Sequence, residues 1–240
     1  MKTSMKFGLM TMCCAAALSV GQAMAAGASP TERAQTQALV QDGKPSATRS
    51  REAGVIATTG GRVKRQGDDL VLALKNKESL TLTTYRTCEG MAATDTSCID
   101  YVLVADLPER GVYVLQKVFY TRTDYALIDA TTGHATTLSV FPQFSDDGKR
   151  FLVAGFDQAD DGDVNAIEIW RRDKDGAVVE WELPYGNVTL GYVARARLVK
   201  WDGDAIAMEF ETGDAAEGKP APKWRGTIKR VGTTWTLTKD

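Results

Sequence analysis

Residues 157–168 form the segment whose residue types and spacing could do chemistry. Its sequence, DQADDGDVNAIE, places oxygen-bearing side chains at the first, fifth, ninth and twelfth positions and a glycine at the sixth, where a calcium-binding loop must bend sharply. The candidate ligands are the side chains of Asp157, Asp161, Asn165 and Glu168 and the backbone carbonyl of Asp163. Ala159 stands where the pattern wants a third carboxylate, and Asp160 could substitute only with a changed backbone geometry. Hard oxygen donors in a flexible loop suit Ca²⁺ better than Mg²⁺ or Zn²⁺.

The same segment has a simpler interpretation as a solvated acidic hairpin loop. Its flanks read as strands rather than helices, which excludes an ordinary EF-hand and leaves the calcium loops of β-hairpins. Four aspartates fall within residues 157–163, and full exposure with salt screening makes their mutual repulsion tolerable. We therefore favour a bare loop without a cofactor and keep calcium as the alternative.

Other candidate sites are weaker. His134, the chain's single histidine, follows Thr131-Thr132-Gly133 in a predicted hairpin turn, and no nucleophile-elbow sequence accompanies it. A hydrolase working with two carboxylates is an alternative, because such pairs meet in space rather than in sequence. Trp224 and Asp160 are candidate binding residues, since each lies in or beside a predicted loop, although packing explains most tryptophans. We expect a binding protein rather than an enzyme.

The N-terminus predicts export. Lys2 and Lys6 precede an uncharged apolar stretch that is too short to span a bilayer, and small residues then mark a cleavage site after Ala25. Residues 1–25 are therefore expected to be a signal peptide, and the mature protein to be periplasmic or secreted. Its formal net charge of about −4 argues against nucleic acid as a partner, and no second long apolar run predicts membrane insertion.

The cysteines agree with an oxidising compartment. Cys13 and Cys14 lie in the signal peptide, which leaves Cys88 and Cys98 as an even pair. We predict a disulfide between these two residues, and on the chain-entropy model a loop of about 11 residues stabilises the fold by roughly 3 kcal/mol.

Residues 26–60 read as a leader to the fold. Ser29-Pro30-Thr31-Glu32 is a good helix start, and Gly43 could end that helix. We expect residues 26–60 to be a flexible linker or a short helix, with disorder from Gly43 to Thr59. From Gly61 onward, alternating apolar residues and Asp/Asn-Gly turns predict short strands, so residues 61–240 are expected to form an all-β domain.

An internal repeat links the two ends of this domain. Residues 61–75, GRVKRQGDDLVLALK, and residues 226–240, GTIKRVGTTWTLTKD, describe the same hairpin, either through common origin or through chance similarity of two short hairpins. Between them, the strands group into units of about forty residues at 101–140, 141–185 and 187–240. Each unit has room for about four strands, which is the size of a propeller blade.

The middle unit carries a resemblance to a known family. Residues 141–151, FPQFSDDGKRF, followed by Ile167-Glu168-Ile169-Trp170, are similar to the P-x-F-S-x-D-G-K-R…I-x-I-W pattern of periplasmic Tol-type and WD-type (WD40-like) β-propellers. The resemblance covers about one blade and implies a propeller-like stack of about four antiparallel blades. It leaves function open, because propellers bind many partners through rim loops and the central channel. We expect a module that binds an unidentified protein or small ligand, and unpaired blade edges would give the chain a reason to form a homodimer.

Overall fold

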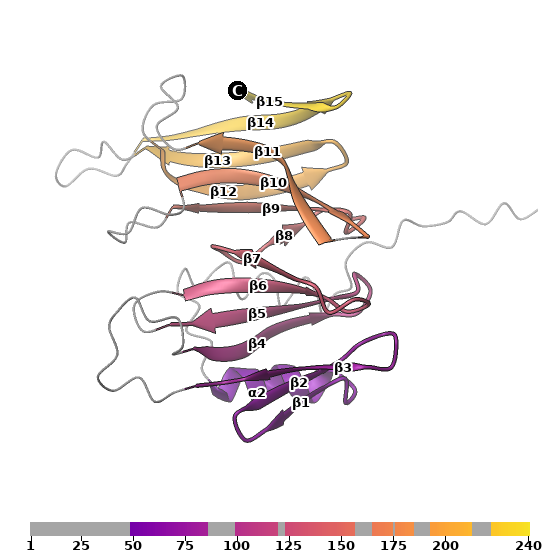
Figure 1. Ribbon diagram of the computed structural model, residues 1–240. Coiled ribbons are helices and arrows are strands. Elements are labelled where there is room, and N and C mark those ends of the chain that lie inside the picture. The colour runs from indigo at the N-terminus through magenta and orange to yellow at the C-terminus, as the bar shows by residue number, and fades with distance from the viewer. Residues whose placement is uncertain are drawn as a thin grey trace, which may run out of the picture.

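The computed structural model describes residues 49–85, 99–119, 123–156, 165–174, 176–184, 193–212 and 222–240. These residues form one helix and four antiparallel sheets, which confirms the predicted all-β, propeller-like architecture. Figure 1 shows the sheets following one another in chain order along the molecule, with the N-terminal sheet at one end and the C-terminal sheet at the other. No helix among the described residues is long and apolar enough to cross a membrane.

Each sheet is a meander of consecutive strands. The first sheet contains β1 (Val63–Gln66), β2 (Asp69–Ala73) and β3 (Ser79–Thr83). The second contains β4 (Asp100–Leu107), β5 (Val112–Val118), β6 (Thr123–Asp129) and β7 (Ala135–Leu138). The third contains β8 (Gln143–Phe144), β9 (Arg150–Phe156), β10 (Asn165–Asp173) and β11 (Gly176–Pro184). The fourth contains β12 (Val193–Asp202), β13 (Ala205–Thr212), β14 (Lys223–Val231) and β15 (Thr234–Lys239).

The strand groups agree with the units predicted from the sequence. The second, third and fourth sheets fall within 101–140, 141–185 and 187–240 to within a residue. The two copies of the internal repeat are both hairpins, β1–β2 and β14–β15, and each turns through a glycine with positive φ, Gly67 at 61° and Gly232 at 64°. Glycine adopts this backbone conformation without the steric cost that other residues meet.

The helix corrects one expectation. Helix α2 (Arg49–Thr58) occupies most of the segment in which disorder was predicted, and it packs against β4 of the second sheet. The sequence gives little signal for this helix because its apolar face is narrow: Val55 and Ile56 pack against the core, while buried Glu52 provides the remaining anchor. The helix start predicted at Ser29–Glu32 lies outside the described residues.

Three apolar clusters fill the spaces between successive sheets. The first lies between α2 and the first two sheets, the second between the second and third sheets, and the third between the third and fourth sheets. Trp170, Trp181, Trp201 and Trp235 belong to these inter-sheet clusters, as expected for blade packing. The outward faces of the two terminal sheets are polar instead, with exposed Lys64 on β1 and Thr236 on β15. Polar outer faces allow a stack of repeated units to terminate in contact with water.

The connections divide between the two ends of the strands. In the second, third and fourth sheets, one end carries the short turns at 108–111, 130–134, 145–149, 174–175, 203–204 and 232–233, which lie on the right of Figure 1. We call this the turn end. The opposite strand ends, where β5, β9, β11 and β13 finish, lead into the connections 119–122, 157–164, 185–192 and 213–221. We call this the loop end.

Candidate functional site

Most of the predicted calcium ligands lie outside the described residues. These are Asp157, Asp161 and Asp163, together with the candidate binding residue Asp160, all in the connection between β9 and β10. Asn165 is the first residue of β10, and Glu168 lies three residues further along the same strand. Within the described ranges, no three His, Cys, Asp or Glu side chains gather closely enough to hold a metal ion. The calcium site therefore stays a prediction.

Glu168 is the one predicted ligand whose side chain is described. Its carboxylate is half-buried and accepts a hydrogen bond from the Trp170 indole Nε1 at 2.7 Å. Glu182 stands directly opposite on β11, so the two acidic side chains share one face of the sheet. Burial raises the pKa of Glu168, the Trp170 hydrogen bond partly opposes that rise, and the negative charge of Glu182 adds to it. A cation close to this pair would relieve both destabilising effects.

The predicted disulfide also lies outside the described residues, because Cys88 and Cys98 fall within 86–98. The residues that bracket this segment are paired. Tyr85 and Ile99 form an antiparallel bridge with backbone hydrogen bonds of 2.9 and 3.1 Å. The two ends of the segment are thus held together by the backbone, which is compatible with a disulfide inside it.

Trp224 lies at the loop end, at the start of β14, but its ring faces inward. It stacks on Phe210 with ring centroids 4.0 Å apart, and the Lys239 ammonium lies 5.3 Å from the centroid of its ring. Gly226 allows this position, since a Cβ there would approach Trp224 Cζ3 to 2.9 Å. The indole Nε1 is buried and has no hydrogen-bond partner among the described residues. The contacts account for packing, and a binding role for Trp224 remains a prediction.

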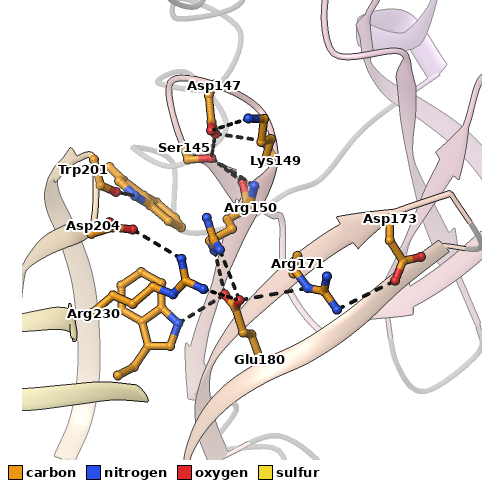
Figure 2. Close-up of polar contacts among 12 residues, drawn as sticks. Ser145, Asp147, Lys149, Arg150, Arg171, Asp173, Glu180, Trp201, Asp204 and Arg230 are labelled. Carbon is orange, nitrogen blue, oxygen red and sulfur yellow. Dashed lines mark hydrogen bonds and ion pairs between the residues drawn. The ribbon is translucent and has the colours of Figure 1, made fainter. Parts of the chain in front are cut away.

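A charged cluster at the turn end joins the third and fourth sheets. It is centred on Glu180 of β11, and we define the Glu180 cluster as Glu180, Arg150, Arg230 and Trp235. Arg150 donates two hydrogen bonds to the carboxylate, at 2.6 and 3.1 Å, and the Trp235 indole donates a third at 3.2 Å. Arg230 forms an ion pair with the same carboxylate at 3.5 Å. Figure 2 shows Arg150 and Arg230 converging on Glu180 from different strands, with Arg171 more distant at 4.0 Å.

A β-bulge places Glu180 in this position. The pairing of β10 with β11 shifts between Ile169 and Trp170, so that Ile169 pairs with Trp181 and Trp170 pairs with Val179. Glu180 is the extra residue, and a bulge of this kind turns two consecutive side chains toward the same side of the sheet. Trp181 and Glu180 therefore both face the fourth sheet.

The electrostatics of the cluster favour a structural role. The hydrogen bond from Arg150 is the largest cause that holds the pKa of Glu180 below its ordinary value; burial opposes it, and Trp235 and Arg230 reinforce it. The same hydrogen bond raises the pKa of Arg150. A carboxylate with a lowered pKa and several donors is a weak base, so the cluster is better suited to hold sheets together than to transfer protons.

Arginine also joins the second and third sheets. Arg172 of β10 donates hydrogen bonds to the carbonyl oxygens of Arg110 at 2.8 Å and Gly148 at 3.2 Å, and it pairs with Asp129 at 3.4 Å. Burial would raise the pKa of Asp129, but hydrogen bonds from Thr132 and neighbouring groups outweigh it and lower that pKa. His134 is exposed in the adjacent turn, as predicted, and its ring lies over Gly176.

Helix α2 provides the corresponding contact between the first and second sheets. Glu52 is 2% exposed and accepts a hydrogen bond from the backbone N–H of Leu103 at 2.8 Å. Arg65 of β1 pairs with Glu52 and donates to the carbonyl oxygen of Tyr101 at 2.6 Å. The ion pair thus satisfies one donor and one acceptor of β4, beside the bulge between Leu103 and Ala105.

Sequence reasoning found none of these three arginine contacts. Each joins residues far apart in the chain, such as Arg150 with Glu180 or Arg172 with Asp129, and the residue types alone do not indicate which pairs meet. The available signal was indirect. Arg150 is the last residue of the S-D-D-G-K-R turn pattern. Within that turn, the Ser145 hydroxyl donates a hydrogen bond to the Asp147 carboxylate at 2.8 Å.

Comparisons with known proteins leave the family open. No family model matches the chain, and no curated protein matches it. Among solved structures, the chain is similar to one described as the crystal structure of the N-terminal domain of Nup159, at 10% sequence identity and a TM-score of 0.34. The match covers 74% of this chain and 47% of that chain, so the present chain spans about half of its length. At this TM-score the likeness carries no argument about function.

Proposed function

We propose that the chain is an exported interaction module that presents its loop end to a protein partner. The observation that carries this proposal is the division of its connections. In the last three sheets, the tight turns lie at one end and the connections 119–122, 157–164, 185–192 and 213–221 all leave the other end. Binding residues occur disproportionately on loops that a rigid scaffold holds in place.

The scaffold has the rigidity that such a role needs. Arginine contacts reinforce all three junctions between sheets, through Arg65, Arg172 and Arg150. Two of these, at Arg172 and Arg150, lie at the turn end, away from the connections that would meet a partner. Variation in the loop-end connections would therefore leave the stack intact.

The chemistry of the loop end favours a basic partner. The connection 157–164 contains four aspartates in eight residues, and Glu168 and Glu182 stand at the adjoining strand ends. The raised pKa of Glu168 reflects burial beside another acid, and a lysine or arginine of a partner would offset it. Complementary charge of this kind speeds association and selects among partners more than it strengthens binding.

A charge-matched pair of variants tests this function. The loop-end variant carries Asp160→Asn, Asp161→Asn and Asp163→Asn. The turn-end control carries the same change at three exposed aspartates, Asp146, Asp173 and Asp202. Tagged proteins are cross-linked in the cells that produce them, and the captured proteins are identified by mass spectrometry and then titrated in purified form.

We expect a basic partner that the original chain and the turn-end control capture well and that the loop-end variant captures much less. With the purified partner, raising the salt concentration should weaken binding to the original chain and leave the residual binding of the loop-end variant nearly unchanged. Equal capture by all three proteins would overturn the proposal. Calcium is the second candidate ligand of this end, supported by the oxygen-donor spacing of residues 157–168 and by the raised pKa of Glu168 beside Glu182.

A further inference from the structure

Among the described residues, the last strand of the fourth sheet has one unpaired edge. β15 pairs only with β14 in the described sheet, and the closing pair of the hairpin is Val231 with Thr234 across the two-residue turn 232–233. In such a hairpin the closing residues exchange hydrogen bonds, so Thr234, Thr236 and Thr238 direct their backbone groups toward β14. Trp235 and Leu237 consequently present theirs at the free edge.

Nothing in the sequence of β15 discourages another strand from pairing there. The strand reads TWTLTK, with no proline or glycine and a single charge at its end. Edges in native sheets are usually blunted by charges, proline, bulges or a covering element. Elsewhere in this chain such protection is present: Glu52 and Arg65 cover the edge of β4, and β11 has a bulge and two glutamates.

The chain itself contains a template for the missing strand. In the internal repeat, β2 corresponds to β15, with Leu70 in the place of Trp235 and Leu72 in the place of Leu237. The edge of β2 that is equivalent to the open edge of β15 is covered by β3. There, Leu70 pairs with Leu82, Val71 with Thr81 and Leu72 with Leu80.

The covering strand has the same residue pattern as β15. β3 reads SLTLT, and residues 234–238 read TWTLT. When a second β15 takes the place of β3, the register of the template puts Trp235 opposite Leu237 of the second copy and Thr236 opposite Thr236 of the second copy. This register is symmetric about a two-fold axis at Thr236, and it brings no like charges opposite each other.

We propose that two copies of the chain pair antiparallel through β15 and join their fourth sheets into one continuous sheet. The backbone groups of Trp235 and Leu237, which β14 leaves free, supply the hydrogen bonds, and Thr234 faces Thr238 of the second copy on the polar side. The inference is independent of the partner proposed for the loop end. The occupant is a second copy rather than an unrelated peptide, because β15 itself has the residue pattern of β3, the strand that covers the equivalent edge of β2.

Introducing a charge at the two-fold axis tests the interface. We expect the unaltered chain to have twice the monomer mass by light scattering, and Thr236→Glu and Thr236→Lys each to be monomers, because equal charges then face each other across the axis. An equimolar mixture of the two variants should recover the dimer. Thr81→Glu, a matched change at an exposed position of β3, should leave the dimer intact.

A cysteine tests the register. Non-hydrogen-bonded antiparallel pairs have Cα atoms about 4.5 Å apart, within the range that a disulfide bridges. Thr236→Cys should therefore cross-link to itself under mild oxidation, as mapped by mass spectrometry, and Thr238→Cys alone should not. The proposal is overturned if the unaltered chain remains a monomer at about 1 mM, where even millimolar affinity is visible. A dimer that survives Thr236→Glu, or that Thr81→Glu disrupts, overturns it equally.

Discussion

Replacing Glu180 by glutamine should weaken the junction between the third and fourth sheets. The substitution keeps the size of the side chain but removes the charge that Arg150 and Arg230 share. Breaking a fully buried ion pair costs about 3–5 kcal/mol, and a charge-assisted hydrogen bond contributes about 1.5–3 kcal/mol. The three charged side chains keep 14–23% exposure and glutamine can still accept one hydrogen bond, so we expect a loss of about 2–4 kcal/mol.

Thermal unfolding followed by circular dichroism measures this loss. For a domain of this size, about 2–4 kcal/mol corresponds to a decrease in Tm of about 5–15 °C at pH 7. Glu182→Gln is the matched control, because Glu182 is exposed on the same strand, two residues away. We expect its Tm to stay within about 2 °C of the original, as for most surface substitutions.

The stabilisation from Glu180 should depend on pH in one direction. The pKa of Glu180 is lowered from its ordinary value of 4.5, so the unfolded chain takes up a proton on this residue before the folded chain does. The stabilisation from Glu180 is therefore fully present above about pH 4.5 and disappears as the pH falls through the lowered pKa. The difference in Tm between the original chain and Glu180→Gln should shrink in the same pH range. A Glu180→Gln protein that is no less stable than Glu182→Gln at pH 7 would refute the structural role of the cluster.

Three further measurements test other parts of the molecule. Calcium in excess of EDTA should raise the free energy of unfolding by about 2.7 kcal/mol at a hundredfold above its Kd, Mg²⁺ should not reproduce the effect, and Asp161→Ala should abolish it; an unchanged Tm would leave residues 157–168 a bare loop. Gly226→Ala should lower the free energy of unfolding by about 1–3 kcal/mol, because the new Cβ would lie 2.8 Å from the Thr238 carbonyl oxygen. As a control, the Cβ of Gly54→Ala in α2 would meet nothing within 4 Å, so this change should raise the free energy of unfolding by about 0.5–1 kcal/mol. Thiol titration of the exported, denatured protein should find Cys88 and Cys98 unreactive until a reductant is added, and reduction should lower the free energy of unfolding by roughly 3 kcal/mol; two free thiols before reduction would exclude the disulfide.

The strands could be predicted from the sequence because the residue patterns that indicate them are local. Alternation at Leu70 and Leu72, or at Ile206 and Met208, marks one buried face of a strand, and the structure buries all four side chains. The turn at Asp202-Gly203 shows the same principle, since Gly203 adopts a φ of 56° that few other residues tolerate. Blade-sized units then follow from the spacing of these signals.

The charged contacts could not be predicted from the sequence, and the reasons are equally physical. Glu180 reaches the fourth sheet only because a bulge shifts the register beside Ile169, and no residue type near that position predicts a bulge. Helix α2 was missed for a related reason, because the side chain that anchors it is the buried Glu52, a residue type that normally predicts exposure. Its partner Arg65 lies beyond the helix, in a strand, and was not identified as such a partner.

The meander topology bears on how the chain loses its structure. Each described sheet consists of strands that follow one another in sequence, so each can form or dissolve largely on its own, and contacts with the next sheet determine how far a local opening spreads. Helix α2 is an exception, because it reaches past the first sheet to β4 and couples the two N-terminal sheets into one cooperative unit. In a single copy of the chain, the amide hydrogens of β12–β15 should then exchange with solvent through a lower-energy opening than those of β1–β5, because side-chain contacts such as the Glu180 cluster, rather than a helix, hold the fourth sheet to the third.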